Sequence, residues 1–78
     1  MKAYFVQIKC KLGRTYEVAS RLAEAEIASE IYSVAGEFDI LAKFYLDNDV
    51  DIGHFVGDKV HPIEGIADTR TIVTFKAF

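Results

Sequence analysis

Asp39 is the residue whose type fits its surroundings least well. It lies between Phe38 and Ile40, in an apolar run that predicts a strand, and aspartate is among the poorest strand formers. A carboxylate there needs partners, which could be backbone amides, hydroxyls or a cationic ligand. Gly36 predicts a hairpin turn with positive φ, which explains Gly36 and Glu37 but leaves Asp39 without an explanation.

Thr69 and Thr71 are the candidate hydroxyl partners. They share one face of the last predicted strand with Val73, because side chains alternate along a strand. Thr is also common in strands because of its β-propensity alone. The two threonines therefore indicate a site only when they are considered together with Asp39.

An acidic run that begins at Asp47 imitates the spacing of a calcium-binding loop. The sixth position of such a loop must be Gly, but here it is Ile52, with Gly53 one place late, and the twelfth position is Asp58 where Glu is required. Acidic residues at a helix N-terminus explain the run more simply.

His54 and His61 are the only histidines and could share one face of the second helix. A metal site needs three or four ligands. A weak site with Asp51 and Asp58 is conceivable, but solvated histidines are the simpler interpretation. Cys10 is expected to be a buried, inert thiol. Because no nucleophile elbow, phosphate loop or carboxylate pair is present either, we expect no catalytic residue, no cofactor and no metal.

Hydrophobic periodicity predicts six elements in the order β-α-β-β-α-β. Strands are expected where apolar residues alternate with polar ones, or where β-branched and aromatic residues are frequent. Helices are expected where apolar residues recur at spacings of three and four. Thr15 is expected to cap the first helix. The predicted strands are 3–12, 29–35, 38–46 and 66–78, and the predicted helices are 15–26 and a segment built on Ile52, Phe55, Val56 and Val60.

This order predicts an α+β, ferredoxin-like fold. Its four-stranded antiparallel sheet should place the first and third strands side by side, with both helices on one face. The helix-free face should then be polar, yet both faces of the predicted strands are apolar, with residues such as Phe5, Leu41 and Val73 as candidates for that face. Six Phe and four Tyr are also many for a small monomer to cover, which predicts contact with a second subunit.

The length and net charge of the chain limit the number of its domains and the kinds of partner it can bind. The 78 residues are expected to form one domain, residues 1–78, since domains span roughly 50 to 250 residues. The net charge of −3 argues against direct nucleic-acid binding. No signal peptide or long apolar stretch is visible, so we expect a cytoplasmic protein that does not enter a membrane.

Along nearly its whole length the chain resembles the ligand-binding domain of the leucine-responsive and asparagine-operon regulators (Lrp/AsnC), also called the regulator-of-amino-acid-metabolism (RAM) domain. The matching marks are Ala3-Tyr4 at the first strand, Gly13 at its end, the segment Val34-Ala35-Gly36-Glu37-Phe38-Asp39, and Gly65-Ile66 leading to Thr69-Arg70-Thr71.

The resemblance implies a dimeric α/β barrel whose dimers assemble into larger rings, such as an octamer, with an amino acid or similar small metabolite bound between dimers. It implies that Gly36, Glu37 and Phe38 form a loop over the ligand, with backbone N–H groups facing its carboxylate. Asp39 would meet the α-amino group, and Thr69 and Thr71 would add hydroxyl contacts. A zwitterion suits such a site because it offers one cation and one anion.

Most members of this family also carry a helix-turn-helix, whereas here the sensing domain begins at Met1. We therefore expect a stand-alone sensing module that could influence transcription through full-length Lrp/AsnC partners. Two alternatives remain open. One is a small dimeric barrel enzyme of the monooxygenase or isomerase type, and the other is a structural subunit with a degenerate pocket.

Overall fold

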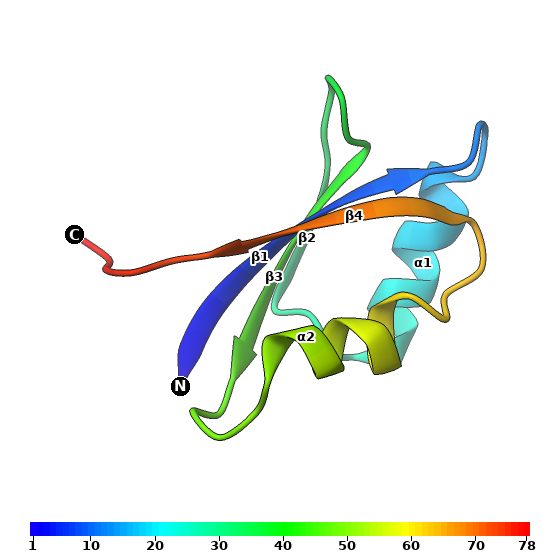
Figure 1. Cartoon of the computed structure of the whole chain (residues 1–78). Helices are drawn as coiled ribbons and strands as arrows, with labels where there is room; N and C mark the ends of the chain where they lie inside the picture. The colour runs from blue at the N-terminus through cyan, green and yellow to red at the C-terminus, as the bar shows by residue number, and fades with distance from the viewer.

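The computed structural model describes all residues from 1 to 78, and its elements follow the predicted order (Figure 1). Four strands form one sheet, and the helices cover one side of it. No helix is long and apolar enough to cross a membrane. The elements are β1 (Lys2–Cys10), α1 (Thr15–Ala25), β2 (Glu30–Ser33), β3 (Ile40–Leu46), α2 (Ile52–Phe55), the π-helix η1 (Val56–Val60) and β4 (Ile66–Val73).

Strand β1 lies at the centre of the antiparallel sheet, whose order is β2-β3-β1-β4. It pairs with β3 from Lys2 opposite Leu46 to Ile8 opposite Ile40. On its other edge it pairs with β4, from Tyr4 opposite Val73 onwards. The first and third strands are therefore neighbours, as predicted for a ferredoxin-like fold.

The core lies between the sheet and the helices. Alternate residues of β1 and β3 point into it and meet Val18 and Leu22 of α1. Phe55 of α2 packs edge-on against Phe44, with 5.4 Å between the ring centroids. The cluster of buried residues comprises Val6, Ile8, Cys10, Val18, Leu22, Ile40, Ala42, Phe44, Leu46, Val56 and Val60. The predicted burial of Cys10 is confirmed.

Several strand boundaries differ from the predictions, among them both ends of β2, which spans Glu30–Ser33 and not 29–35. β1 ends at Cys10, and Leu12 lies fully exposed in a turn where Gly13 adopts φ +76°. β3 begins at Ile40 and not at Phe38, because the hairpin pairing closes with Ser33 opposite Ile40. β4 ends at Val73, the last residue paired with β1, so the predicted extension to residue 78 is wrong.

The helices also differ from the predictions in detail. Thr15 is not the cap of α1: Arg14 is the N-cap residue, without a side-chain cap, and its guanidinium pairs with Glu17 in the first turn. Asp51 does cap the second helix, accepting the backbone N–H of His54 at 2.9 Å. That helix widens after Phe55 into η1, a π-helix that the apolar spacing did not reveal.

The helix-free face of the sheet is mixed in character. It carries Phe5, Leu41, Tyr45 and Ile72, but also Lys43, whose ammonium lies 4.8 Å from the Tyr45 ring centroid. Ile72 and Tyr45 are 39% and 45% exposed, so much of this apolar surface is uncovered.

Val73 was expected on the helix-free face and does not lie there. It pairs with Tyr4, which shares its face of β1 with the core residues Val6 and Ile8, so Val73 points to the helix side. Val73 is nevertheless 46% exposed, because β4 is an edge strand.

Gly65, just before β4, is the glycine for which the packing leaves no room. Its φ is +102°, and a Cβ there would lie 2.8 Å from Cγ2 of Val18. Gly65→Ala should therefore lower the free energy of unfolding by about 2 kcal/mol, through backbone strain and overpacking. Urea denaturation measures the loss. Gly57→Ala is the matched control, because a Cβ at Gly57 meets nothing within 4 Å. Equal effects of the two substitutions would contradict this account.

Candidate functional site

The segment 34–39, between β2 and β3, forms a closed loop. The Val34 N–H donates to the Asp39 carbonyl at 2.9 Å, and this bond closes its base. Gly36 has φ +113°, a conformation that glycine adopts without strain, which confirms the predicted turn. The loop is exposed from Val34 to Glu37 and is therefore open to a ligand or a neighbouring chain.

Asp39 is anchored to β1 by both its backbone and its side chain. Its N–H donates to the Ile8 carbonyl at 2.9 Å, and its Oδ2 accepts the Cys10 N–H at 2.8 Å. The sequence left three kinds of partner open for this carboxylate, and the structure provides a backbone amide. The bond fixes one carboxylate oxygen, and Oδ1 keeps its capacity to accept a further hydrogen bond.

The Cys10 thiol shares this environment. Burial raises its pKa most, the negative charge of Asp39 raises it further, and a hydrogen bond with Thr15 works in the opposite direction. The thiol is therefore held in its protonated, unreactive form, in line with the inert role expected for it.

Phe38 and Glu37 contact two cationic residues of the helix-free face of the sheet. Phe38 is only 7% exposed but does not belong to the main core. The Arg70 guanidinium lies 5.2 Å from its ring centroid, and the Lys9 ammonium donates to the Glu37 carbonyl at 3.2 Å. Both cations belong to the helix-free face, because Arg70 pairs with Gln7. These contacts hold the loop in place.

A hollow of about 300 Å³ opens beside Asp39. We call it the Asp39 hollow, and it is lined by Thr15, Tyr16, Ser33, Val34, Ala35 and Asp39. Of the predicted site residues only Asp39 lines it. Sequence reasoning missed the hydroxyl-bearing residues at the start of α1 and the end of β2, whose only signal was their polar type.

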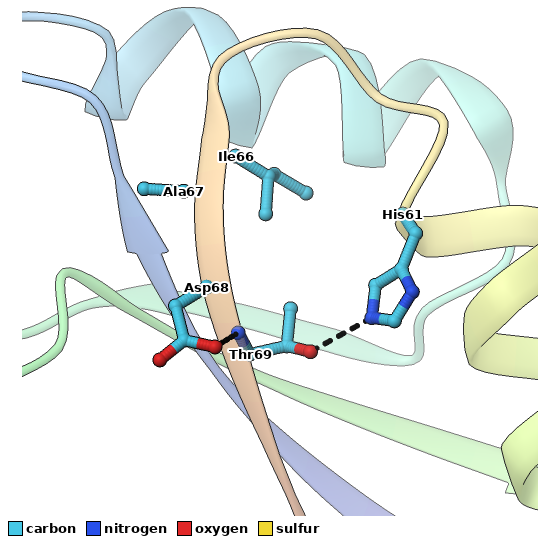
Figure 2. A pocket seen from close by; sticks show the side chains of 5 residues that line it. All are labelled: His61, Ile66, Ala67, Asp68 and Thr69. Carbon is cyan, nitrogen blue, oxygen red and sulfur yellow. Dashed lines mark hydrogen bonds between the residues drawn. The ribbon is translucent and has the colours of Figure 1, made fainter.

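Thr69 lies in a different hollow, of about 370 Å³, at the free edge of β4 (Figure 2). We call it the β4 hollow, and it is lined by His61, Ile66, Ala67, Asp68 and Thr69. Here Thr69 Oγ1 lies 2.9 Å from His61 Nε2. Thr71 lines neither hollow and is exposed. His61 was singled out in the sequence only as a conceivable metal ligand, and its contact with Thr69 was not foreseen.

The two hollows lie on opposite sides of β1. Ile8 pairs with Ile40, next to Asp39, on one edge and with Thr69 on the other. Two strand spacings, about 10 Å, therefore separate the positions of Asp39 and Thr69. Within one chain the threonine hydroxyls are not partners of the Asp39 carboxylate, so the expectation that they could satisfy it is wrong.

No group of three or more His, Cys, Asp or Glu side chains lies close enough together to hold a metal ion. The calcium-like run from Asp47 to Asp58 is divided between a turn, α2 and η1, and Asp51 is engaged as the cap of α2. The polar groups of the two hollows are instead suited to hydrogen-bonding a small polar molecule.

Comparison with known proteins identifies relatives. The model of the family described as the Lrp/AsnC ligand binding domain matches residues 3–78. The HTH-type transcriptional regulator FL11 of Pyrococcus furiosus is 35% identical over 72 residues, which cover 92% of this chain and 47% of that protein. The chain thus spans about half the length of the curated relatives it matches.

Solved structures show the same fold. The protein TTHA0845 from Thermus thermophilus superposes with a TM-score of 0.89 at 28% identity, covering 100% of this chain and 98% of that one. The transcriptional regulator NMB0573 of Neisseria meningitidis, solved as an L-Met complex, superposes with a TM-score of 0.81. It is 18% identical, and the match covers 96% of this chain and 50% of that one. The ferredoxin-like interpretation is confirmed.

The anchoring role of Asp39 can be separated from its charge. Asp39→Ala leaves the partly buried Cys10 N–H without a partner and should lower the free energy of unfolding by about 1.5 to 3 kcal/mol. Asp39→Asn keeps an oxygen that accepts this N–H and should cost clearly less. Chemical denaturation of both variants makes the comparison, and equal losses would show that the bond to Cys10 contributes nothing.

Proposed function

This chain belongs to the Lrp/AsnC ligand-binding domain family, and we propose that it is a sensing and oligomerisation module for an amino acid or a similar small metabolite. The observation that carries the proposal is the Asp39 carboxylate, anchored through one oxygen at the edge of an open hollow. An anchored carboxylate is a preorganised acceptor for an ammonium group. The L-Met complex of a protein with the same fold supports an amino acid as the class of ligand.

The complete site is proposed to form between copies of the chain. Asp39 and Thr69 lie in separate hollows, and each hollow is open to solvent. Asp39 would accept the α-ammonium group, the Gly36-Glu37-Phe38 loop would close over the ligand and present N–H groups to its carboxylate, and Thr69 and Thr71 of another copy would add hydroxyls. A site divided in this way would couple ligand binding to assembly.

Assembly is proposed to begin on the helix-free face, as a dimeric α/β barrel from which larger rings are built. The exposed apolar residues of that face and its cationic Lys43, paired with Glu30 at 3.5 Å, suit a mixed interface. The matched regulator FL11 is named as a transcriptional regulator and is about twice as long. We therefore infer that this domain acts on transcription together with a DNA-binding partner of the Lrp/AsnC type, in the cytoplasm.

A thermal-shift screen of the twenty amino acids tests the ligand. At one hundred times its dissociation constant, a ligand should add about 2.7 kcal/mol to the stability and raise the melting temperature measurably. Asp39→Asn should abolish this rise while the protein stays folded. Asp49→Asn is the matched control, because Asp49 follows the far end of β3. A ligand response that survives in Asp39→Asn would refute the assigned role of this carboxylate.

Two adjacent residues of β4 test the interface. Ile72 and Val73 are similarly exposed, at 39% and 46%, but point to opposite faces of the sheet. Ile72→Asp should reduce the native mass of the assembly, because it places a charge in the proposed contact, and Val73→Asp should leave the mass unchanged. Native mass spectrometry gives both values. The proposed face would be abandoned if the two variants behaved alike.

A further inference from the structure

Beyond the end of β4 the chain carries an uncovered aromatic ring. β4 ends at Val73, and residues 74–78, which we call the arm, extend beyond the sheet (Figure 1). Thr74 still contacts β1, because its Oγ1 donates to the Ala3 carbonyl at 3.1 Å. The next residue, Phe75, is 99% exposed. Single exposed rings are common on protein surfaces, so the surroundings of Phe75 decide what its exposure means.

The largest hollow of the molecule, about 710 Å³, opens between the arm and the strands β1 and β3. We call it the arm hollow. Its lining includes Ala3 and Phe5 of β1, Lys43 and Tyr45 of β3, and residues 74–77 of the arm. Phe75 lines the hollow and is nevertheless almost fully exposed, so its ring does not fill the hollow of its own chain.

The walls of the arm hollow suit an aromatic ring. Phe5 and Tyr45 line it, and the Lys43 ammonium lies 5.6 Å and 4.8 Å from their ring centroids. A hydrogen bond with Tyr45 is the largest cause that raises the pKa of Lys43, so the ammonium stays charged at neutral pH. No Asp or Glu side chain lines the hollow. A third ring that enters it can pack against two rings and offer its face to a cation.

A second copy of the chain carries the group that fits. Each copy holds the hollow and the exposed Phe75 ring next to each other, so a single two-fold axis can seat both arms at once. Phe5, Lys43 and Tyr45 also belong to the helix-free face, on which the dimer contact is proposed, so the two contacts would be continuous. An unrelated aromatic ligand would fill the hollow but leave Phe75 in water.

We propose that two copies exchange their arms, and that Phe75 of each copy packs into the arm hollow of the other, against Phe5, Tyr45 and Lys43. The inference rests on the proposed function and deepens it, because it names the residues that join the copies at one end of the helix-free face. Burial of each ring would remove roughly 150–250 Å² of surface from water.

Phe75→Ser tests the exchange through the dissociation constant of the assembly. Loss of a ring from a well-packed contact should raise that constant about tenfold or more, which analytical ultracentrifugation over a dilution series measures. Leu12→Ser is the matched control, because Leu12 is also fully exposed, at 101%, but lies in the turn after the far end of β1. Phe75 lies outside the core, so circular dichroism should show an unchanged fold.

The outcomes separate the exchange from the proposed assembly. Wild-type affinity in Phe75→Ser, or an equal loss in Leu12→Ser, would overturn the exchange. An assembly that is weakened by Ile72→Asp but not by Phe75→Ser would overturn the exchange alone. A wild-type chain that stays monomeric would count against both.

A disulfide between copies tests the position of the arm. Both chains carry Cys10→Ala, which keeps the backbone N–H that Asp39 accepts. One chain, labelled with ¹⁵N, also carries Phe75→Cys, and the other carries Ala3→Cys, which leaves the rings of the hollow in place. Oxidised glutathione should convert the mixture to a disulfide-linked dimer of one labelled and one unlabelled chain, which mass spectrometry resolves. Leu12→Cys in place of Ala3→Cys is the control, and an equal yield from the two pairs would contradict the exchange.

Discussion

Strand β1 is hydrogen-bonded along both of its edges, and the rest of the molecule depends on that central position. Its inward-facing side chains form part of the hydrophobic core. Its backbone pairs with β3 along one edge and with β4 along the other. Because Ile8 pairs on both sides, the start of β3 and the middle of β4 are fixed relative to each other. The same pairing keeps Asp39 and Thr69 on opposite sides of β1, so the two residues line separate hollows within one chain.

Much of the fold could be predicted from the sequence because alternation and helical spacing report which face of an element is buried. The element order and the inward residues of β1 and β3 follow directly from that pattern. The ends do not. Phe38 continues the apolar run of β3 but belongs to a loop, because hairpin pairing stops at Ser33. Val73 was misplaced because a bulge at Ala67 changes which residues of β4 share a face.

The site was predictable only in part. Asp39 could be identified because a carboxylate in an apolar run needs an explanation, and its bond to the Cys10 amide supplies one. Its hollow could not be identified, since Thr15 and Ser33 are ordinary residues until the chain brings α1 and β2 together. The pairing of His61 with Thr69 depends on a π-turn and a bulge, and neither leaves a periodic trace in the sequence.

The arrangement at Cys10 has one more consequence. Its amide holds Asp39 in place, while its thiol experiences the charge of that same carboxylate. A cation bound to Asp39 would offset one of the two causes that raise the pKa of the thiol, while burial, the larger cause, would remain. The thiol therefore stays buried and protonated whether or not the Asp39 carboxylate is neutralised.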